Sequence, residues 1–400
     1  MKIRRLLAST LALFALNAVQ AAEPAVTVDP KIVNKLSQSD AWNSNKPLDQ
    51  QISQRANEAM SVLMTLKPGQ DGLPPPLEKP FNVSVCLFDI LGKNGELYSR
   101  AKDMVLIARR WNVFIELQVY TDERITAENF KAGQCDAATI STLRARQFNK
   151  FIGSIDSVGG VPTYAHMRLL LKTLLDPKVV PLSITEPYQI VGVMPIGALY
   201  VMVRDRQINS IEKAAGKKVA VLDWDKSQAE MVQKLGAQPV ASDITNFAGK
   251  FNNGQVDIIA APAIAYRPLE LYKGLGKDGA VYKFSLAQAT GSLVINRERL
   301  KKKLPDLDKH LETLRSVALQ YMDRAMDELF IVLNKMEADI PAKYWMALTP
   351  SDEKRYVEMM RQARIQMTRD GYYDPRMMKV QKKIRCKIDP AAAECVLNDE

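Results

Sequence analysis

Polar and aromatic side chains follow the apolar segments that predict strands in this chain, and they are its candidates for ligand contact. Trp224 stands between two acids, Asp223 and Asp225, directly after one such segment. An indole face stacks on planar rings and attracts cations, so this trio suits a planar or cationic solute. A loop tryptophan that packs on its own lobe is an equally good interpretation. The other candidates of this kind are Asp89, Thr139, Ser141, Thr142, Arg144 and Tyr266.

Catalytic and metal-binding patterns are missing from the sequence. Histidine occurs only twice, at His166 and His310, and neither belongs to a His-x-x-x-His or Glu-x-x-His pattern. The chain has no nucleophile elbow, P-loop or GxGxxG turn. An enzyme would need an acid pair such as Asp89 and Asp223 to face one pocket. We therefore expect a binding protein that is not an enzyme and that uses no cofactor and no metal.

The elements that must position these residues follow a βαβαβ order. Residues 81–90, 113–120 and 135–140 predict strands, with one helix ending near residue 110 and another over 126–133. This order is typical of a parallel sheet with helices on both faces. In such a sheet ligands lie beyond the carboxyl ends of the strands, which is why the residues after each segment are candidates.

The same order recurs further along the chain. Strands are expected at 217–223, 238–241 and 256–261, and helices at 227–235 and 247–252. The segments 133–136 and 254–257 even share a Gly that ends a helix and an Asp that opens a strand. The requirements of a turn from a helix into a strand are enough to explain a match of four residues. Together with the repeated order, it predicts two similar α/β lobes.

Helical segments flank and connect the two predicted lobes. Residues 305–336 carry apolar side chains at steps of three and four and predict one long helix that braces both lobes. Thr349 and Pro350 begin a further helix that ends at Gly371. Beyond this helix the tail of the chain carries six basic residues with no acidic residue between them, so it is a possible contact surface. These are Arg376, Lys379, Lys382, Lys383, Arg385 and Lys387.

The chain begins with a segment typical of export. Its 400 residues, 47% hydrophobic and 25% charged, fit a folded chain with more than one core, and the formal net charge is +10. Lys2, Arg4 and Arg5 precede an apolar run and small residues, which predicts a signal peptide cleaved after Ala21. The run is shorter than the roughly 20 residues that span a bilayer. An uncleaved helical anchor is the alternative.

Four cysteines are compatible with disulfides, because an exported protein folds in an oxidising compartment. Cys386 and Cys395 could close a local staple near the C-terminus. Cys86 and Cys135 lie in separate predicted strands and can pair only if those strands are neighbours. We expect two bridges, although four cysteines allow three connectivities.

Several segments resemble the extracytoplasmic solute receptors of TRAP transporters. They are residues 130–136, 207–219, 235–240 and 253–257, with 292–296 similar to the late hinge strand of that family. The resemblance covers roughly residues 81 to 345 and implies two α/β lobes, hinge strands and a long bracing helix. The whole chain is similar to AdeT-like proteins, which carry the labels of solute-binding proteins and of RND-type efflux components.

The resemblance also implies a carboxylate clasp that this chain lacks. TRAP receptors for organic acids hold the carboxylate with two Arg and one Asn, at positions where this sequence has Leu199, Ala220 and Ala261. An arginine fork is what makes carboxylate binding strong. We therefore expect an apolar, aromatic or cationic solute rather than a simple carboxylate, with Tyr200 as one further contact.

These inferences give a two-lobed periplasmic binding protein fold of class α/β, in which each lobe is a mainly parallel sheet with flanking helices. The expected parts are a signal peptide (1–21), an N-terminal helical extension with a Pro-rich linker (22–80), lobe I (81–198), lobe II (199–290), a hinge strand with the long helix (291–345), and a C-terminal helical extension with a basic tail (346–400).

The function that we predict is that of a periplasmic solute-binding protein that presents a small molecule to a membrane transporter. The alternative is a non-catalytic periplasmic accessory or adaptor of an RND-type efflux system. We expect no nucleic-acid partner. After signal cleavage the chain is not expected to be an integral membrane protein.

Overall fold

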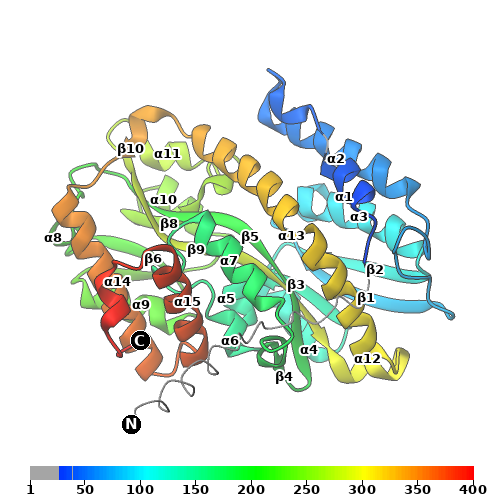
Figure 1. Cartoon of the computed structure of the whole chain (residues 1–400). Helices are drawn as coiled ribbons and strands as arrows, with labels where there is room; N and C mark the ends of the chain where they lie inside the picture. Colours follow the sequence, from blue (N-terminus) through cyan, green and yellow to red (C-terminus); the bar gives the residue numbers. More distant parts are fainter. Residues whose placement is uncertain (1–26, 38) are drawn as a thin grey trace, which may run out of the picture.

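The computed structural model describes residues 27–37 and 39–400 (Figure 1). Two groups of strands and helices lie side by side and are joined by long central strands and by helix α13 (Figure 1). The expected signal peptide, residues 1–21, lies outside the described residues. Within the described ranges, no helix is both long and apolar enough to cross a membrane.

Ten strands of the described chain form one mixed sheet. Its order is β2-β1-β3-β9-β5-β8-β6-β7, and the short strands β4 and β10 pair with β5 and β9. The strands are β1 (Phe81–Phe88), β2 (Val113–Tyr120), β3 (Ala137–Ser141), β4 (Ile184–Thr185), β5 (Tyr188–Val203), β6 (Lys218–Leu222), β7 (Gln238–Ser242), β8 (Ile258–Pro262), β9 (Ala280–Asn296) and β10 (Trp345–Met346).

Lobe I is built on β1, which pairs in parallel with both β2 and β3. The helix expected from residue 126 begins three residues earlier, because Asp122 caps it by accepting from the backbone N–H groups of Arg124 and Ile125. Gly133 ends it with a φ of 89°, a conformation that favours glycine. The helices of this lobe are α3 (Glu96–Arg109), α4 (Glu123–Ala132), α5 (Thr142–Ala145), α6 (Lys150–Gly153) and α7 (Tyr164–Leu174).

Lobe II repeats the arrangement with β6 between β7 and β8, again in parallel. Its predicted strands and helices are all present, with ends that shift by one or two residues. Both faces of its sheet are apolar and covered, one around Met202 and Phe251 and the other around Val203 and Tyr282. Its helices are α8 (Ile211–Ala214), α9 (Lys226–Lys234), α10 (Phe247–Asn252) and α11 (Leu271–Leu275).

Two long antiparallel strands, β5 and β9, run through both lobes and connect them. β9 pairs with β3 of lobe I near its end, and β5 pairs with β8 of lobe II near its own end. The hinge strand expected at 292–296 is therefore only the last part of β9 (Ala280–Asn296). The expected lobe boundaries at 198/199 and 290/291 fall inside these two strands.

The long helix expected at 305–336 is present as α13 (Leu307–Ala338). It follows α12 (Arg297–Lys303) and runs diagonally across both lobes in Figure 1. The N-terminal helices α1 (Pro30–Ser37) and α2 (Leu48–Thr65) lie along it, and Arg55 pairs with Glu328. The short 3-10 helices are η1 (Ala41–Asn43), η2 (Gly92–Asn94), η3 (Val180–Ser183), η4 (Ala263–Ala265), η5 (Ala342–Tyr344) and η6 (Ala393–Val396).

The C-terminal part forms two helices, α14 (Pro350–Arg369) and α15 (Pro375–Ile388). The second packs on α6 and α7, and the first packs on the second. The expected cap is present, because the Thr349 hydroxyl accepts from the Asp352 backbone N–H at 3.1 Å. Gly371 ends the first helix with a φ of 78°. Together the two helices cover residues 151–161, every one of which is buried.

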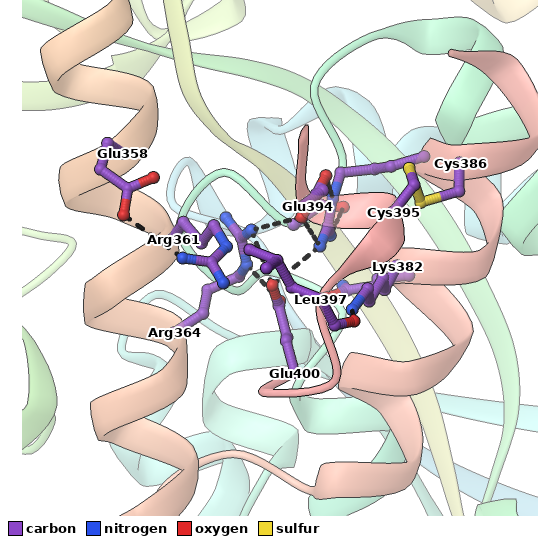
Figure 2. Close-up of polar contacts among 12 residues, drawn as sticks. Glu358, Arg361, Arg364, Lys382, Cys386, Glu394, Cys395, Leu397 and Glu400 are labelled. Carbon is purple, nitrogen blue, oxygen red and sulfur yellow. Dashed lines mark hydrogen bonds and ion pairs between the residues drawn. A yellow bond between two sulfur atoms is a disulfide. The ribbon is translucent and has the colours of Figure 1, made fainter. Parts of the chain in front are cut away.

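A cluster of arginines and acids, which we call the C-terminal clamp, ties the last residues to these helices (Figure 2). Arg385 donates to both oxygens of Glu394, at 2.7 and 2.8 Å. Arg364 donates to Glu400 at 2.6 Å, and Arg361 pairs with Asp399. Within the basic tail that was considered a possible contact surface, Arg385 is buried, because acids further along the chain fold back onto it.

The structure confirms both expected disulfides. Cys86 and Cys135 join, with an S–S distance of 2.02 Å, because β1 and β3 are neighbours in the sheet. Cys386 and Cys395 close a loop of nine positions that brings η6 back to α15 (Figure 2). The first bridge lies in the core of lobe I, and the second holds Glu394 of the C-terminal clamp near its arginines.

Candidate functional site

The candidate site lies where the lobes meet, at the carboxyl ends of β3 and β6. Ser141 ends β3 and caps α5, accepting from the Arg144 backbone N–H at 3.1 Å. Trp224 follows β6, and Asp225 caps α9 by accepting from the Ser227 backbone N–H. Two short turns from opposite lobes therefore face each other, as expected for strands that end at one edge.

Arg144 makes the first contact between the lobes. Its guanidinium carbon lies 4.1 Å from the centre of the Trp224 ring, within the range of a cation–π interaction. Its Nε lies 3.5 Å from Glu123 Oε2. Glu123 is buried and also accepts from the Ser141 backbone N–H at 2.6 Å. The guanidinium is therefore held between an indole face and a carboxylate.

Arg146 makes the second contact between the lobes. Its Nη1 lies 3.5 Å from Asp225 Oδ2, and its Nε donates to the Gly153 carbonyl at 3.1 Å. The Ser227 hydroxyl donates to Asp225 at 2.5 Å, so the buried carboxylate has partners besides the arginine. Arg146 also lies 5.3 Å from the ring of Tyr373, which follows α14. We call the contacts of Arg144 and Arg146 the interlobe contact.

Polar side chains anchor lobe I to the hinge strand β9 beneath this contact. Asp156 accepts from both the backbone N–H and the hydroxyl of Thr290, at 3.1 and 2.6 Å. The Thr142 hydroxyl bonds the Ser292 hydroxyl at 2.7 Å. The site is thus coupled directly to the strand on which the lobes hinge.

Two buried carboxyl groups near the site have raised pKa values. Burial raises the pKa of Asp156 from 3.8 to about 7, against the opposing hydrogen bonds from Thr290. Burial also raises the pKa of Glu123, and the hydrogen bonds from Ser141 and the charge of Arg144 oppose that rise. Both groups lie where a bound solute or a lobe movement would change their surroundings.

Two of the candidate residues carry buried polar atoms without a hydrogen-bond partner among the described residues. They are the Thr139 hydroxyl on β3 and the indole Nε1 of Trp224. Burying a polar group without a partner costs about 1–3 kcal/mol, so such atoms call for an explanation.

The two other acidic candidates form no ion pair with Arg144 or Arg146 in the part of the chain that the structure describes. Asp89 is buried, and its carboxylate accepts from the backbone N–H groups of Leu91 and Tyr98, each at 3.0 Å. It shapes the turn that begins α3. Asp223 is exposed and has only its backbone N–H engaged, with Ser242. The structure does not bring these two acids together as a pair.

The two candidate tyrosines lie on the side of lobe II that faces α13. Tyr200 packs edge-on against Trp345, with ring centres 4.9 Å apart. Tyr266 is buried in the same apolar cluster, and burial raises its pKa to about 12. Neither is recorded in contact with Trp224. The candidates therefore separate into a group at the interlobe contact and a group near the long helix.

The three positions of the missing carboxylate clasp are apolar and packed. Ala261 is fully buried and Ala220 packs against the same cluster of lobe II. Leu199 is half-buried on β5, opposite Pro262. No charged group stands at these positions to bind a carboxylate.

Sequence reasoning missed three residues that complete the site, Glu123, Arg146 and Asp156. Glu123 carries one usable signal, an acid at the first helical position after the Asp122 cap. Arg146 repeats the Arg144 charge two positions later, but nothing in the sequence shows that Asp225 would face it. Among the described residues, no group of three or more His, Cys, Asp or Glu side chains could hold a metal ion.

Comparison with protein families finds one match. A family described as "Solute-binding protein AdeT 1/2" matches residues 105–400. The chain is 41% identical over 314 residues to "Probable solute-binding protein AdeT1" of Acinetobacter baumannii, covering 78% of this chain and 100% of the relative. It is 27% identical to "Probable solute-binding protein AdeT2" of the same organism, over 62% of this chain and 100% of that protein.

Solved structures with the same fold are TRAP periplasmic solute-binding proteins. One from Ralstonia eutropha, with bound (S)-2-acetolactate, has a TM-score of 0.61 at 15% identity and covers 76% of this chain and 99% of its own. The ectoine-binding protein of Halomonas elongata has a TM-score of 0.59 at 14% identity, covering 78% and 100%. These likenesses confirm the expected two-lobed α/β fold.

Proposed function

Because this chain belongs to the AdeT 1/2 family of solute-binding proteins, we propose that it is a periplasmic receptor that closes its lobes on a small solute at the interlobe contact. One observation carries the proposal. Arg144 of lobe I lies on Trp224 of lobe II, beside the buried carboxylate of Glu123. A solute bound between the lobes would occupy the position that the Arg144 side chain fills in the structure.

Closure and opening follow from the contacts at this position. A solute that takes the place of the Arg144 guanidinium would touch lobe II through Trp224 and lobe I through Glu123. It would also reach the unpartnered Nε1 of Trp224. Binding both lobes at once stabilises the closed arrangement, because a ligand favours the state that it binds better. The proposed hinge lies in β5 and β9.

The solute class that this position favours is a planar organic cation. An aromatic face and a buried carboxylate together attract positive charge, and Arg144 itself shows that a guanidinium fits. The apolar residues Leu199, Ala220 and Ala261 leave no clasp for a simple carboxylate. The solved relatives that bind acetolactate or succinate therefore do not set the ligand of this chain.

A binding role has no need of catalytic groups, and we propose that the chain is not an enzyme and uses no cofactor. We propose further that it hands its solute to a membrane transporter, as expected for receptors of the TRAP type. The reported relatives are named solute-binding proteins, which does not favour an adaptor role in RND-type efflux. Cleavage of a signal peptide after Ala21 remains a proposal, and the mass of the secreted protein tests it.

Thermal shift tests the proposal, because a compound that binds the native state raises the melting temperature. The compounds are planar cations such as guanidinium derivatives, with succinate and galacturonate as carboxylates. We expect a cation to raise the melting temperature of the wild type. Arg144→Ala removes the competing guanidinium and leaves Glu123 uncompensated, so the cation should bind roughly five- to tenfold more tightly.

The opposite results would contradict the proposal in different ways. If carboxylates alone raise the melting temperature and Arg144→Ala abolishes that effect, the protein is a receptor but the solute class is wrong. If no compound has an effect on either protein, the receptor function itself loses its support. Lys302→Met, at an exposed lysine of α12, is the control for a lost positive charge.

A further inference from the structure

A hollow of about 410 Å³ lies between the end of α13 and the strands β5, β9 and β10. It is apart from the interlobe contact and shares no residue with it. Its lining residues are Tyr200, Lys283, Asn334, Glu337, Ala338 and Trp345. Three of these belong to α13, so the hollow borders the helix that braces both lobes.

One wall of the hollow is an aromatic corner. The rings of Tyr200 and Trp345 meet edge to face, with centres 4.9 Å apart and planes at 85°. The indole Nε1 donates to the Ile340 carbonyl at 3.2 Å, which fixes the ring. Such a corner offers a preformed apolar surface for a ring or an alkyl chain.

The second wall carries the carboxylate of Glu337. It accepts a hydrogen bond from the Tyr164 hydroxyl of α7 and lies close enough to Tyr200 to raise the pKa of that phenol, although burial is the larger cause. Both neighbours are neutral. Within the described part of the chain, no lysine or arginine pairs with Glu337. A half-buried carboxylate without a cationic partner favours a positive group in the adjoining space.

The third wall carries Lys283 of β9. This side chain is exposed and has no hydrogen bond or ion pair with any residue that the structure describes. Asn334, also exposed, adds an amide that can donate to a carboxylate. The lining of the hollow therefore carries the anionic side chain of Glu337 and the cationic side chain of Lys283, together with the aromatic rings of Tyr200 and Trp345.

We propose that this hollow is a second binding site, for a zwitterionic amino acid with an apolar side chain. Its ammonium group pairs with Glu337 and its carboxylate with Lys283 and Asn334. Its side chain lies against Tyr200 and Trp345. A cation alone would be repelled by Lys283, and an anion alone by Glu337, so both charges are needed. The site is independent of the solute bound at Trp224.

Isothermal titration calorimetry of the mature protein tests this proposal with three probes that differ only in charge. L-Phenylalanine carries both charges, 2-phenylethylamine the cation and 3-phenylpropionate the anion. We expect phenylalanine to bind and each single-charge probe to bind at least tenfold more weakly. Absence of phenylalanine binding to the wild type, or equal binding of all three probes, overturns the proposal.

Four variants locate the binding. Glu337→Gln and Lys283→Met should each weaken phenylalanine binding at least tenfold, and the glutamine oxygen can still accept from Tyr164. The matched controls Glu298→Gln and Lys302→Met change exposed residues of α12 and should leave affinity unchanged.

Trp224→Ala distinguishes the two sites. It should leave phenylalanine binding intact while removing the solute of the interlobe contact. If Trp224→Ala abolishes phenylalanine binding, or if both hollow variants bind like the wild type, the second site does not exist. Melting temperatures of all variants show whether each is folded.

Discussion

Two of the regions that contain arginine–carboxylate pairs, the C-terminal clamp and the interlobe contact, are built differently. In the clamp, Arg385 reaches both oxygens of Glu394 at 2.7 and 2.8 Å. In the interlobe contact, Arg144 and Arg146 each reach a carboxylate through one atom at 3.5 Å. The arginine side chains are 6% exposed in the first case and 11–14% in the second, so burial is similar.

The two regions differ in the geometry of their ion pairs. This difference distinguishes the fixed contacts of the clamp from contacts that a solute can replace. Short two-atom pairs with an arginine are strong and specific, and losing one partner leaves a buried charge behind. A single long contact costs little to replace. The clamp thus holds the C-terminal helices on the buried residues 151–161, while the interlobe contact can give way to a solute.

Removing a clamp arginine should have the largest effect on stability. Arg385→Met leaves Glu394 without its closest cation, removes one of the two arginines that pair with Glu400, and frees the Gly160 carbonyl. We expect the free energy of unfolding to fall by about 3 kcal/mol, the usual cost of breaking a buried pair. Urea denaturation measures it. Lys383→Met, at an exposed position of the same helix, is the control, and an equal loss there would remove the distinction.

Removing the Cys386–Cys395 disulfide, the C-terminal staple, should have the next largest effect on stability. The double variant Cys386→Ala/Cys395→Ala releases a loop of nine positions, for which chain entropy predicts a loss of about 2.5 kcal/mol. The loss should depend on the clamp, because the staple brings Glu394 to Arg385. If the double variant is as stable as the wild type, the clamp does not need the staple.

Acid should weaken the clamp. Arg385 and Arg364 hold the pKa of Glu394 below its usual value of 4.5, against the effect of burial. The native state then binds fewer protons than the unfolded state, so this stabilisation is present above about pH 5 and is lost as the pH falls through the lowered pKa. Unfolding free energies between pH 6 and 3 check this. In Glu394→Gln the dependence on pH should be smaller, and an unchanged slope would contradict the assignment.

The same substitution at the interlobe contact should have the smallest effect. Arg146→Met removes one 3.5 Å pair and the hydrogen bond to the Gly153 carbonyl. Asp225 keeps its bonds from the Ser227 N–H and hydroxyl. We expect a loss of about 1 kcal/mol, in the range of weak ion pairs. Measured beside Arg385→Met, it compares the two regions directly. Equal losses would show that the interlobe contact is as fixed as the clamp.

Sequence reasoning predicted the strands β1–β3 and β6–β8 and the helices α3, α4, α9 and α10 between them, because these elements have local signals, such as the Gly133 end of α4. It did not predict the length of β5, because Gly192, Pro195 and Gly197 are typical of turns. In the structure the strand continues past them through irregular pairing with β9. Whether β5 continues past these residues depends on its pairing with β9, a strand distant in the sequence, and a local sequence pattern does not contain that information.

The candidate site was predictable to the extent that strand ends meet at one edge. That rule led to Ser141, Arg144 and Trp224 as residues to examine, and in the structure Arg144 contacts both of the others. It could not assign Tyr200, whose side chain faces α13, because the face of a hinge strand depends on its register. The acids that neutralise Arg385 were missed for a similar reason, since they return only after a stapled turn.

The most direct test of the central claim is the affinity of the Trp224 variants for the strongest compound of the thermal shift series. Isothermal titration calorimetry compares the wild type with Trp224→Ala and Trp224→Phe. A solute that stacks on the indole should bind at least tenfold more weakly to Trp224→Ala and within about threefold of the wild type to Trp224→Phe. Wild-type affinity in Trp224→Ala would contradict a solute site at the interlobe contact.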